Sequence, residues 1–167
     1  MLLPALLALS LVAGQADPYD DEFHDDDHGG ADTGLFVVAR GGSAYDANGG
    51  PSVSVVGGEI GWSFEALDLS VAGYGYRGLR PVPAGEKKAW DPVVLMRLGQ
   101  RFETYRGLEG TLDLGIGAAR IETDKWRSWV QLAMGVHLAI DPLFVTGEIT
   151  FEQNGLIRLT GGLGARF

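Results

Sequence analysis

The chain has no cysteine among its 167 residues. It therefore has no disulfide framework, no thiolate nucleophile and no cysteine that could accept a lipid. From Gly34 onward it also lacks any convincing stripe of apolar residues at the helical period. The apolar run Leu2–Val12 is too short to span a bilayer as a helix. These absences exclude a disulfide-stabilised scaffold and a cysteine-based enzyme.

Small residues follow the apolar run. Ala13, Gly14 and Ala16 come directly after it, which is typical of the cleavage site of a secretory signal peptide. We predict a signal peptide over residues 1–16, cleaved after Ala16, and the alternative is a buried helix. The segment departs from the usual pattern because no lysine or arginine precedes the apolar run.

Lysine and arginine are also missing from the next segment, Asp17–Asp32, which holds eight of the 22 acidic residues. The formal net charge of −9 belongs mainly to this segment, because the rest of the chain carries fourteen acids and thirteen bases. Dense like charge with little apolar content cannot offset the entropy that is lost on ordering. We predict that residues 17–33 form a disordered acidic leader in the periplasm.

The leader contains two histidines among aspartates. His24, Asp26 and His28 are therefore weak candidates for holding a divalent cation. Their spacing matches no preorganised site, and a calcium loop needs a glycine and a bidentate glutamate that are missing here. A flexible site must also lose conformational entropy when it binds an ion. We expect a solvated linker, no dedicated metal site and no cofactor.

Residues 34–167 alternate apolar and polar side chains with a period of two, and turn residues recur about every ten positions. The pattern predicts one all-β domain, an eight-stranded antiparallel up-and-down transmembrane barrel. The predicted strands cover residues 35–43, 53–64, 67–78, 93–104, 108–120, 128–140, 143–153 and 156–167. The predicted connections are short at 65–66, 105–107 and 141–142, a two-residue hairpin at Asn154-Gly155, and longer at 44–52, 79–92 and 121–127.

The alternation divides the strands into an apolar face and a charged face. The apolar face collects Val56, Ile60, Trp62, Phe64, Leu67, Leu69, Val71, Val94, Met96, Leu98, Phe102, Leu112, Leu114, Ile116, Val130, Leu132, Met134, Val136, Leu138, Ile140, Val145, Ile149 and Phe151. The charged face is interleaved with glycines. Whether Tyr74 and Tyr76 share the charged face depends on whether a bulge shifts the register of strand 67–78.

Charges that line a narrow barrel must pair, since little bulk water fits there. We predict an ion-pair network inside the barrel that consists of Arg40, Glu59, Arg97, Arg101, Glu109, Asp113, His137, Glu148, Glu152, Arg158 and Arg166. In this arrangement His137 could meet Glu148 on the neighbouring strand. The alternative is a soluble barrel like a lipocalin, with the same alternation and the two faces exchanged.

The final strand carries a resemblance to a known family. In residues 156–167 every second side chain is apolar or glycine, and the last residue is Phe167. Such a terminal aromatic resembles the C-terminal signal of bacterial outer-membrane barrels. Residues 34–167 are similar to the small outer-membrane barrels of the OmpA/OmpX type in their alternation, their turn lengths and this strand.

The resemblance implies a bacterial outer-membrane location, with the leader in the periplasm and the longer connections outside the cell. It implies that Phe167 is part of a membrane-insertion signal that the barrel-assembly machinery recognises. It also implies contacts with outer-membrane lipid and lipopolysaccharide and with protein partners in the cell envelope, and no nucleic-acid partner.

Bases and tryptophans gather in and beside two of the longer connections. The bases are Arg77, Arg80, Lys87, Lys88, Lys125 and Arg127, and Trp90 and Trp126 lie close to them in the sequence. At the external rim of a barrel they could bind lipopolysaccharide phosphates. The alternative is an ordinary mixed surface, since the acids Asp46, Glu86, Asp91, Glu122 and Asp124 nearly balance the bases.

The sequence favours a non-enzymatic outer-membrane barrel with a structural or interaction role. Some barrels of this size are lipid A deacylases, which place a histidine and a serine two residues apart on one strand. Here Ala139 follows His137 at that distance, so the motif is broken. A lipid-modifying enzyme that uses His137 with an interior carboxylate is one alternative, and a secreted soluble carrier is another. No specific ligand, transported solute or oligomeric state is indicated.

Overall fold

The computed structural model describes residues 33–50, 52–78, 89–105, 107–120 and 125–167, and for residues 103–105 it describes the backbone alone. The predicted signal peptide and nearly all of the predicted leader lie outside these residues. The metal candidates His24, Asp26 and His28 lie outside them as well. Within the described residues, no helix is long and apolar enough to cross a lipid bilayer.

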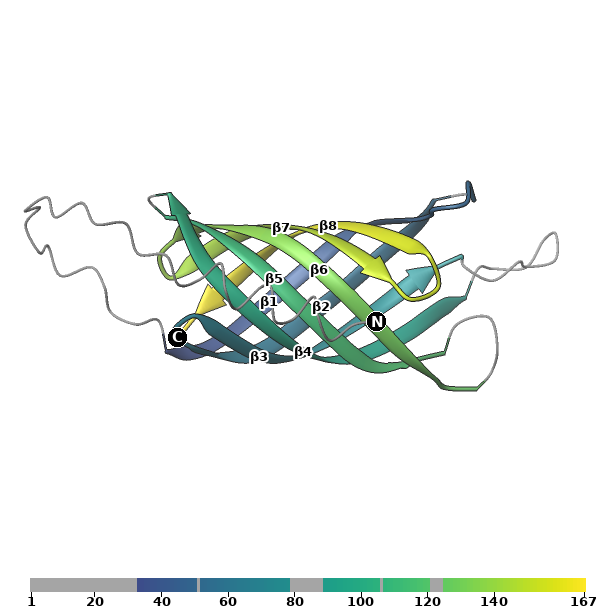
Figure 1. The fold of residues 1–167 in the computed structure, drawn as a ribbon, viewed down its shortest axis with the longest axis horizontal. Helices are drawn as coiled ribbons and strands as arrows, with labels where there is room; N and C mark the ends of the chain where they lie inside the picture. Colours follow the sequence, from purple (N-terminus) through teal and green to yellow (C-terminus); the bar gives the residue numbers. More distant parts are fainter. Residues whose placement is uncertain (1–32, 51, 79–88, 106, 121–124) are drawn as a thin grey trace, which may run out of the picture. The chain divides into compact units, whose positions relative to one another are not determined.

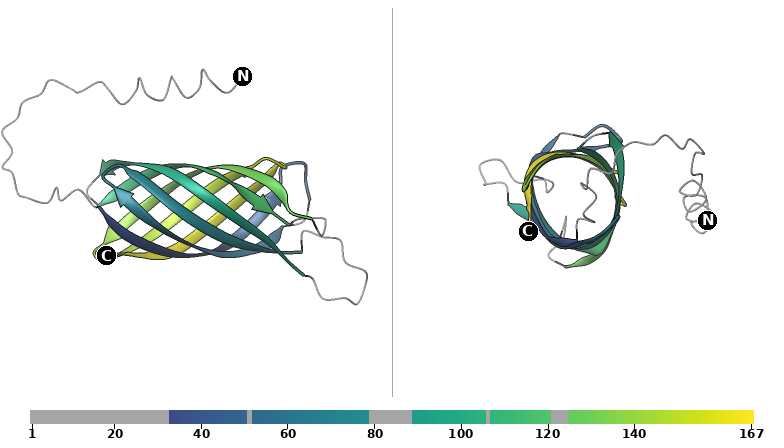
Figure 2. Two further views of the ribbon diagram at one scale, coloured as in Figure 1. Left: turned by 90° about the horizontal axis from the view of Figure 1, so that it is seen from below. Right: turned by 90° about the vertical axis from the view of Figure 1, so that its left-hand side faces the viewer.

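Eight antiparallel strands form a closed barrel in which consecutive strands pair and β1 also pairs with β8 (Figure 1). The end-on view in Figure 2 shows the closed ring. The strands are β1 (Gly34–Asp46), β2 (Val53–Phe64), β3 (Leu67–Arg77), β4 (Trp90–Tyr105), β5 (Leu108–Ala119), β6 (Arg127–Ile140), β7 (Leu143–Glu152) and β8 (Leu156–Arg166). The predicted fold class and strand order are confirmed.

Two strands extend further than predicted. β1 continues to Asp46 because Ala44, Tyr45 and Asp46 all pair with β8. β4 begins at Trp90 because Trp90 and Asp91 pair with β3. In both cases the hydrogen bonds of a neighbouring strand continue the ladder beyond the point where the local composition is typical of a loop.

The two ends of the barrel differ in the length of their connections. One end, the turn end, has the two-residue connections 65–66, 106–107 and 141–142, together with the start of β1 and the end of β8 (Figure 1). Glu65 has a φ of 52° and Gly107 a φ of 73°, so the chain reverses there through left-handed backbone. The other end, the loop end, has the connections 47–52, 78–89, 120–126 and 153–155.

The prediction of a two-residue β7–β8 hairpin is wrong. The connection has three residues, Gln153–Gly155, and of these Gly155 alone has a positive φ, of 83°. The Gly155 amide donates to the Glu152 carbonyl at 3.0 Å, and the Leu156 amide donates to the Asn154 side chain at 3.2 Å. Asn154 thus acts through its side-chain oxygen, whereas a type I′ turn would need it in left-handed backbone.

The register of β3, which the sequence left open, is continuous. β3 pairs with β2 and β4 without a shift from Leu67 to Arg77. Tyr74 and Tyr76 therefore both point into the barrel, where 3% and 0% of their surfaces are exposed. A register shift occurs instead between Glu103 and Tyr105 of β4, where that strand pairs with β5.

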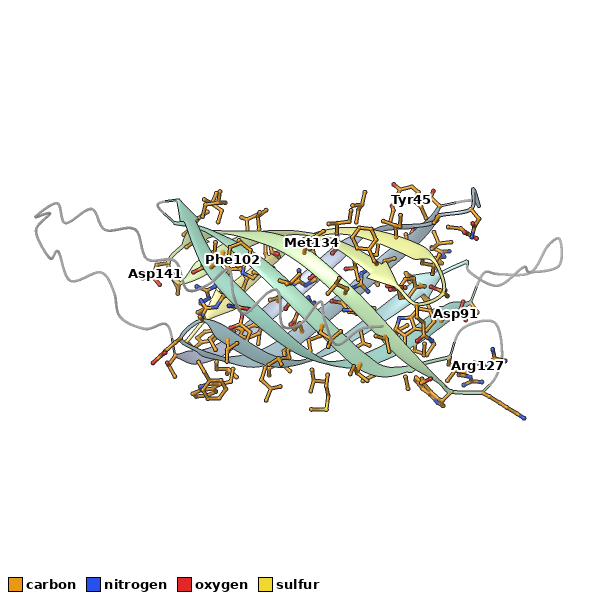
Figure 3. All side chains as sticks on the ribbon, viewed as in Figure 1. Tyr45, Asp91, Phe102, Arg127, Met134 and Asp141 are labelled. Carbon is orange, nitrogen blue, oxygen red and sulfur yellow. The ribbon has the colours of Figure 1, made fainter. Side chains whose placement is uncertain are left out.

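The outer surface of the barrel is a belt of large apolar side chains to which every strand contributes (Figure 3). The belt comprises Val37, Val56, Ile60, Trp62, Phe64, Leu67, Leu69, Val71, Val94, Met96, Leu98, Phe102, Leu114, Ile116, Val130, Leu132, Met134, Val136, Leu138, Ile140, Leu143, Val145, Phe151, Leu159 and Leu163. Among the described side chains, no charged residue interrupts these outward positions between the strand ends. Soluble monomers rarely expose a continuous apolar surface of this extent. Strands of 10 to 16 residues are also long enough to cross a bilayer.

A charge placed on the belt tests whether hydrocarbon covers it. Met134 lies near mid-length and Ile140 beside the turn at Asp141 (Figure 3). We expect Met134→Arg to lower the free energy of unfolding in lipid vesicles by about 2–4 kcal/mol, and Ile140→Arg by only about 0–1 kcal/mol. Urea titration followed by tryptophan fluorescence measures both. Equal losses at the two positions would contradict a belt that spans hydrocarbon.

Candidate functional site in the barrel interior

The side chains that fill the interior change in kind from one end of the barrel to the other. A central network, which extends from mid-length toward the loop end, consists of Arg40, Glu59, Arg97, Asp113, Glu148, Glu152 and Arg158. A mouth cluster at the turn end consists of Asp68, Arg101, Glu109, His137 and Arg166. An apolar plug toward the loop end consists of Val53, Val55, Val93, Leu95, Trp129 and Leu156.

Arg97 occupies the middle of the central network and is 1% exposed. Its Nη1 donates to Glu59 Oε2 and to the Tyr74 hydroxyl, both at 2.9 Å. Its Nη2 donates to Glu148 Oε2 at 2.6 Å and lies 3.2 Å from Asp113 Oδ2. One guanidinium from β4 thus compensates carboxylates on β2, β5 and β7.

Glu148 is the acid on which three arginines converge. Besides Arg97, it pairs with Arg40 Nη1 at 3.2 Å and with Arg158 Nη2 at 3.3 Å. Thr150 Oγ1 also donates to it at 2.9 Å. A carboxylate with so many donors is well compensated inside a medium of low dielectric constant, because charge-assisted hydrogen bonds replace the water it has lost.

Arg158 joins the remaining strands to the network and is fully buried. Its guanidinium lies 3.9 Å from the centroid of the Tyr74 ring, donates to Gln131 Oε1 at 3.0 Å, and pairs with Glu152 at 3.2 Å. The Tyr76 hydroxyl bridges the two, since it accepts from Arg158 at 2.7 Å and donates to Glu152. Through these contacts the central network includes side chains from all eight strands.

The mouth cluster is a second, separate set of ion pairs. Glu109 accepts from both terminal nitrogens of Arg166, at 2.6 and 3.2 Å, and from Arg101 at 3.5 Å. Arg101 also lies 3.1 Å from Asp68 and donates to the carbonyl of Glu65 in the adjacent turn. These side chains are less deeply buried than those of the central network, because they face the open turn end.

His137 belongs to the mouth cluster, and the expected contact with Glu148 is wrong. Its Nδ1 lies 3.9 Å from Glu109 Oε2, which is too long for a hydrogen bond, and its ring packs on Phe144 with centroids 5.1 Å apart. On β7 its ladder partner is Thr146, two residues before Glu148. Because strands in a barrel are tilted, Glu148 lies at the height of the arginines and not of the histidine.

Glycines on the inward face make room for the large interior side chains. A Cβ added at Gly57 would collide with the Tyr74 ring, and one at Gly99 would collide with the Asp113 carboxylate. A Cβ at Gly115 would lie 2.7 Å from Gln131 Cγ. Arginine and tyrosine side chains fit into a barrel this narrow because a neighbouring strand contributes no side chain at the same height.

The comparisons with known proteins concern the fold. No protein-family model matches the chain, and no curated protein matches it. Its structure is similar to that of Neisserial surface protein A, with a TM-score of 0.58 and 16% identity over 81% of this chain and 97% of that one. It is equally similar to the N-terminal β-barrel domain of Pseudomonas aeruginosa OprF, with a TM-score of 0.59 and 15% identity over 81% of this chain and 98% of that one.

The chain has the fold of a small eight-stranded outer-membrane β-barrel. A de novo designed transmembrane β-barrel also matches, with a TM-score of 0.58 and 16% identity over 81% of this chain and 96% of the design. At such low identity the common element is the architecture, so the functional argument must come from the residues of this barrel.

The eleven residues that the sequence analysis assigned to an interior network all lie on the inward side of the barrel. The structure divides them between the central network and the mouth cluster. The partners outside the predicted set of eleven are Asp68, Ser70, Tyr74, Tyr76, Gln131, Thr146 and Thr150. Phe167 lies at the turn end, where its amide donates to the Leu35 carbonyl at 2.9 Å.

The apolar plug was also missed. The alternation of the sequence does indicate it. Val53 and Val55 lie on the same face of their strand as Glu59, and Val93 and Leu95 lie on the same face as Arg97. The loop-end half of the interior thus combines this apolar cluster with buried charged residues, namely Asp91, Glu152 and Arg158. The network is held by directed hydrogen bonds, and the plug excludes water from the loop-end side.

The charged groups of the interior pair mainly with one another. The guanidinium groups and carboxylates of the central network are joined by ion pairs and hydrogen bonds. Ala139 stands where an acyl-transfer motif would place a serine after His137. In the described part of the chain, no group of three or more metal-ligating side chains is arranged to hold an ion.

Removing one partner from the central network should be far more costly than removing one from the mouth. We expect Arg97→Met to lower the free energy of unfolding of the barrel by about 3–5 kcal/mol, since it leaves Glu59 and Glu148 short of positive charge. Arg166→Met, whose side chain is 18% exposed, should cost no more than about 1 kcal/mol. Urea unfolding in detergent micelles measures both, and similar losses would contradict the division into two clusters.

Proposed function

We propose that the chain is a bacterial outer-membrane protein that spans the membrane as a filled barrel and has a structural or interaction role rather than a catalytic one. The observation that carries this proposal is the pairing of an uninterrupted apolar belt with an interior of compensated charges. Only a lipid environment stabilises that arrangement, because lipid covers the belt and leaves the polar side chains to one another.

The orientation follows from the two ends of the barrel. Outer-membrane barrels place short turns in the periplasm and longer connections outside the cell. The turn end would then face the periplasm, with the predicted leader of residues 17–33 entering β1 there. The loop end would face the outside. With this orientation Phe167, which follows the last residue of β8, lies on the periplasmic side, where the barrel-assembly machinery could recognise it during insertion.

A general diffusion pore does not fit the interior. Arg97, Arg158 and Tyr76 lie across the barrel with at most 1% of their surfaces exposed. Tyr76 belongs to the same buried cluster as the apolar plug, which fills the loop-end half of the interior. An eight-stranded barrel is just wide enough for its interior side chains to fill it. An interaction role at the surface of the barrel therefore fits this interior better than transport through it.

Two measurements on the full-length protein test the proposal. It should fractionate with outer membranes and shift its gel mobility on heating in detergent, as folded barrels do. Purified barrel in a planar bilayer should give no large, steady conductance, because the central network and the plug occupy the interior. Recovery in the soluble fraction without detergent would contradict the membrane location, and a steady open channel would contradict the filled interior.

The enzymatic alternative would use His137 and Glu109 as an acid–base pair in modifying lipid A. Their 3.9 Å separation and their place at the turn end speak against it, since lipid A lies in the outer leaflet on the opposite side. We expect the mass spectrum of lipid A to be the same in cells with the wild-type protein, with His137→Ala and without the gene. A mass change that depends on His137 would overturn the non-catalytic assignment.

The soluble-carrier alternative requires the two faces to be exchanged. A lipocalin-like barrel would hold Leu132, Met134 and Val136 inside and leave Arg97 and Glu148 in water. The burial of these residues is the opposite, because the first three are exposed and the last two are buried. The proposal of a membrane barrel is therefore preferred.

A further inference from the structure

Exposed bases and tryptophans gather on one arc of the loop end. Arg77 and Trp90 come from the ends of β3 and β4, and Lys125, Trp126 and Arg127 from the start of β6 and the residues before it. All five side chains are exposed, and Trp90 and Trp126 are about half exposed. We call these five residues the basic rim.

The basic rim extends over the loop ends of β3, β4 and β6, with β5 between β4 and β6. Arg77 and Trp90 are ladder partners, and the Arg77 guanidinium lies 5.9 Å from the centroid of the Trp90 ring. Ala119 at the end of β5 is the ladder partner of Arg127 on one side and of Val93 in β4 on the other. Figure 3 shows Arg127 at the same end of the barrel as Asp91, the residue that follows Trp90.

The opposite arc of the loop end has a different charge. Among the exposed described residues there, Asn48, Gln153 and Asn154 are neutral, and Asp46 is acidic. Asp91 does not reduce the charge of the basic rim on its exposed surface, because it is fully buried on the inward face of β4. By sequence, the neighbouring connections add Arg80, Lys87 and Lys88 against Glu86, Glu122 and Asp124, so the net positive charge of this arc comes from the described bases.

The position of the basic rim along the barrel axis indicates which layer of the membrane surrounds it. Its residues lie on the loop-end side of the belt, with Trp90 four residues from Val94 and Arg127 three residues from Val130. Tryptophans at that level are typical of the interface between hydrocarbon and headgroups. Bases beside them therefore face the headgroup layer of the outer leaflet, given the orientation of the proposed function.

We propose that the basic rim binds the phosphate groups of a phosphorylated glycolipid of the outer leaflet, the class to which lipid A belongs. This inference depends on the proposed function for its orientation. Two guanidinium forks and one ammonium can donate charge-assisted hydrogen bonds to phosphate oxygens. The tryptophan rings offer apolar faces to sugar rings at the same depth. The glycolipid thus associates with the β3–β6 side of the barrel and not with the β7–β2 side.

Binding of purified lipid A to the full-length barrel in zwitterionic detergent tests this inference. The probes are bis-phosphorylated lipid A and the same lipid after removal of its phosphates. We expect wild-type protein to prefer the phosphorylated form, and the triple variant R77Q/K125Q/R127Q to bind it about tenfold more weakly or worse. The matched control R77K/K125R/R127K keeps every charge and should retain the wild-type affinity.

The outcomes separate this inference from the proposed function. Heat-modifiable gel mobility checks that each variant is a folded barrel, and its absence in the wild-type protein would contradict the membrane barrel itself. If the folded wild-type barrel binds both lipids equally, or if the triple variant binds like the wild type, the inference is overturned while the proposed function stands. Equal affinity for phosphatidylglycerol overturns the assignment to a glycolipid, because a single diester phosphate would then be enough.

Discussion

The structure depends on one electrostatic constraint, which is that charges enclosed by a narrow barrel must compensate one another without water. Glu148 meets this constraint by pairing with arginines from three strands, and Arg97 meets it by pairing with acids from three others. The apolar belt creates the constraint, because outward positions given to lipid leave only inward positions for polar side chains. The apolar outer surface and the charged interior therefore both result from the alternation of apolar and polar side chains along each strand.

The interior also determines which inward positions carry large side chains and which carry glycine. Arg97, Arg158, Tyr74 and Tyr76 extend across the barrel, and inward glycines on neighbouring strands leave the space that they fill. The central network, the mouth cluster and the apolar plug together fill the interior along the barrel axis. Surface functions, such as lipid contact at the basic rim, then rest on a scaffold that does not need to open.

The sequence predicts the faces of the strands well, because side-chain direction in a strand depends only on parity. The eight strands, the belt and the inward position of the charged residues all follow from that parity. Partners are harder to predict, because they depend on height along the barrel axis, which is set by strand tilt and register. His137 illustrates this. Its parity correctly predicts an inward side chain, but the strand register places that side chain beside Glu109 and not beside Glu148. The plug was missed for the same reason, since its valines share the parity of the charged residues.

Glu148 on β7 is held by Arg40 of β1 and Arg158 of β8, so its contacts straddle the seam where the first and last strands meet. An open sheet that has not yet joined those two strands would leave this carboxylate without its full set of counterions. Sealing of the seam therefore completes the neutralisation of the buried acid, because it adds Arg40 to Arg158 of the neighbouring strand. Assembly of the barrel should consequently be cooperative, with incomplete sheets disfavoured by the charge that they cannot yet enclose.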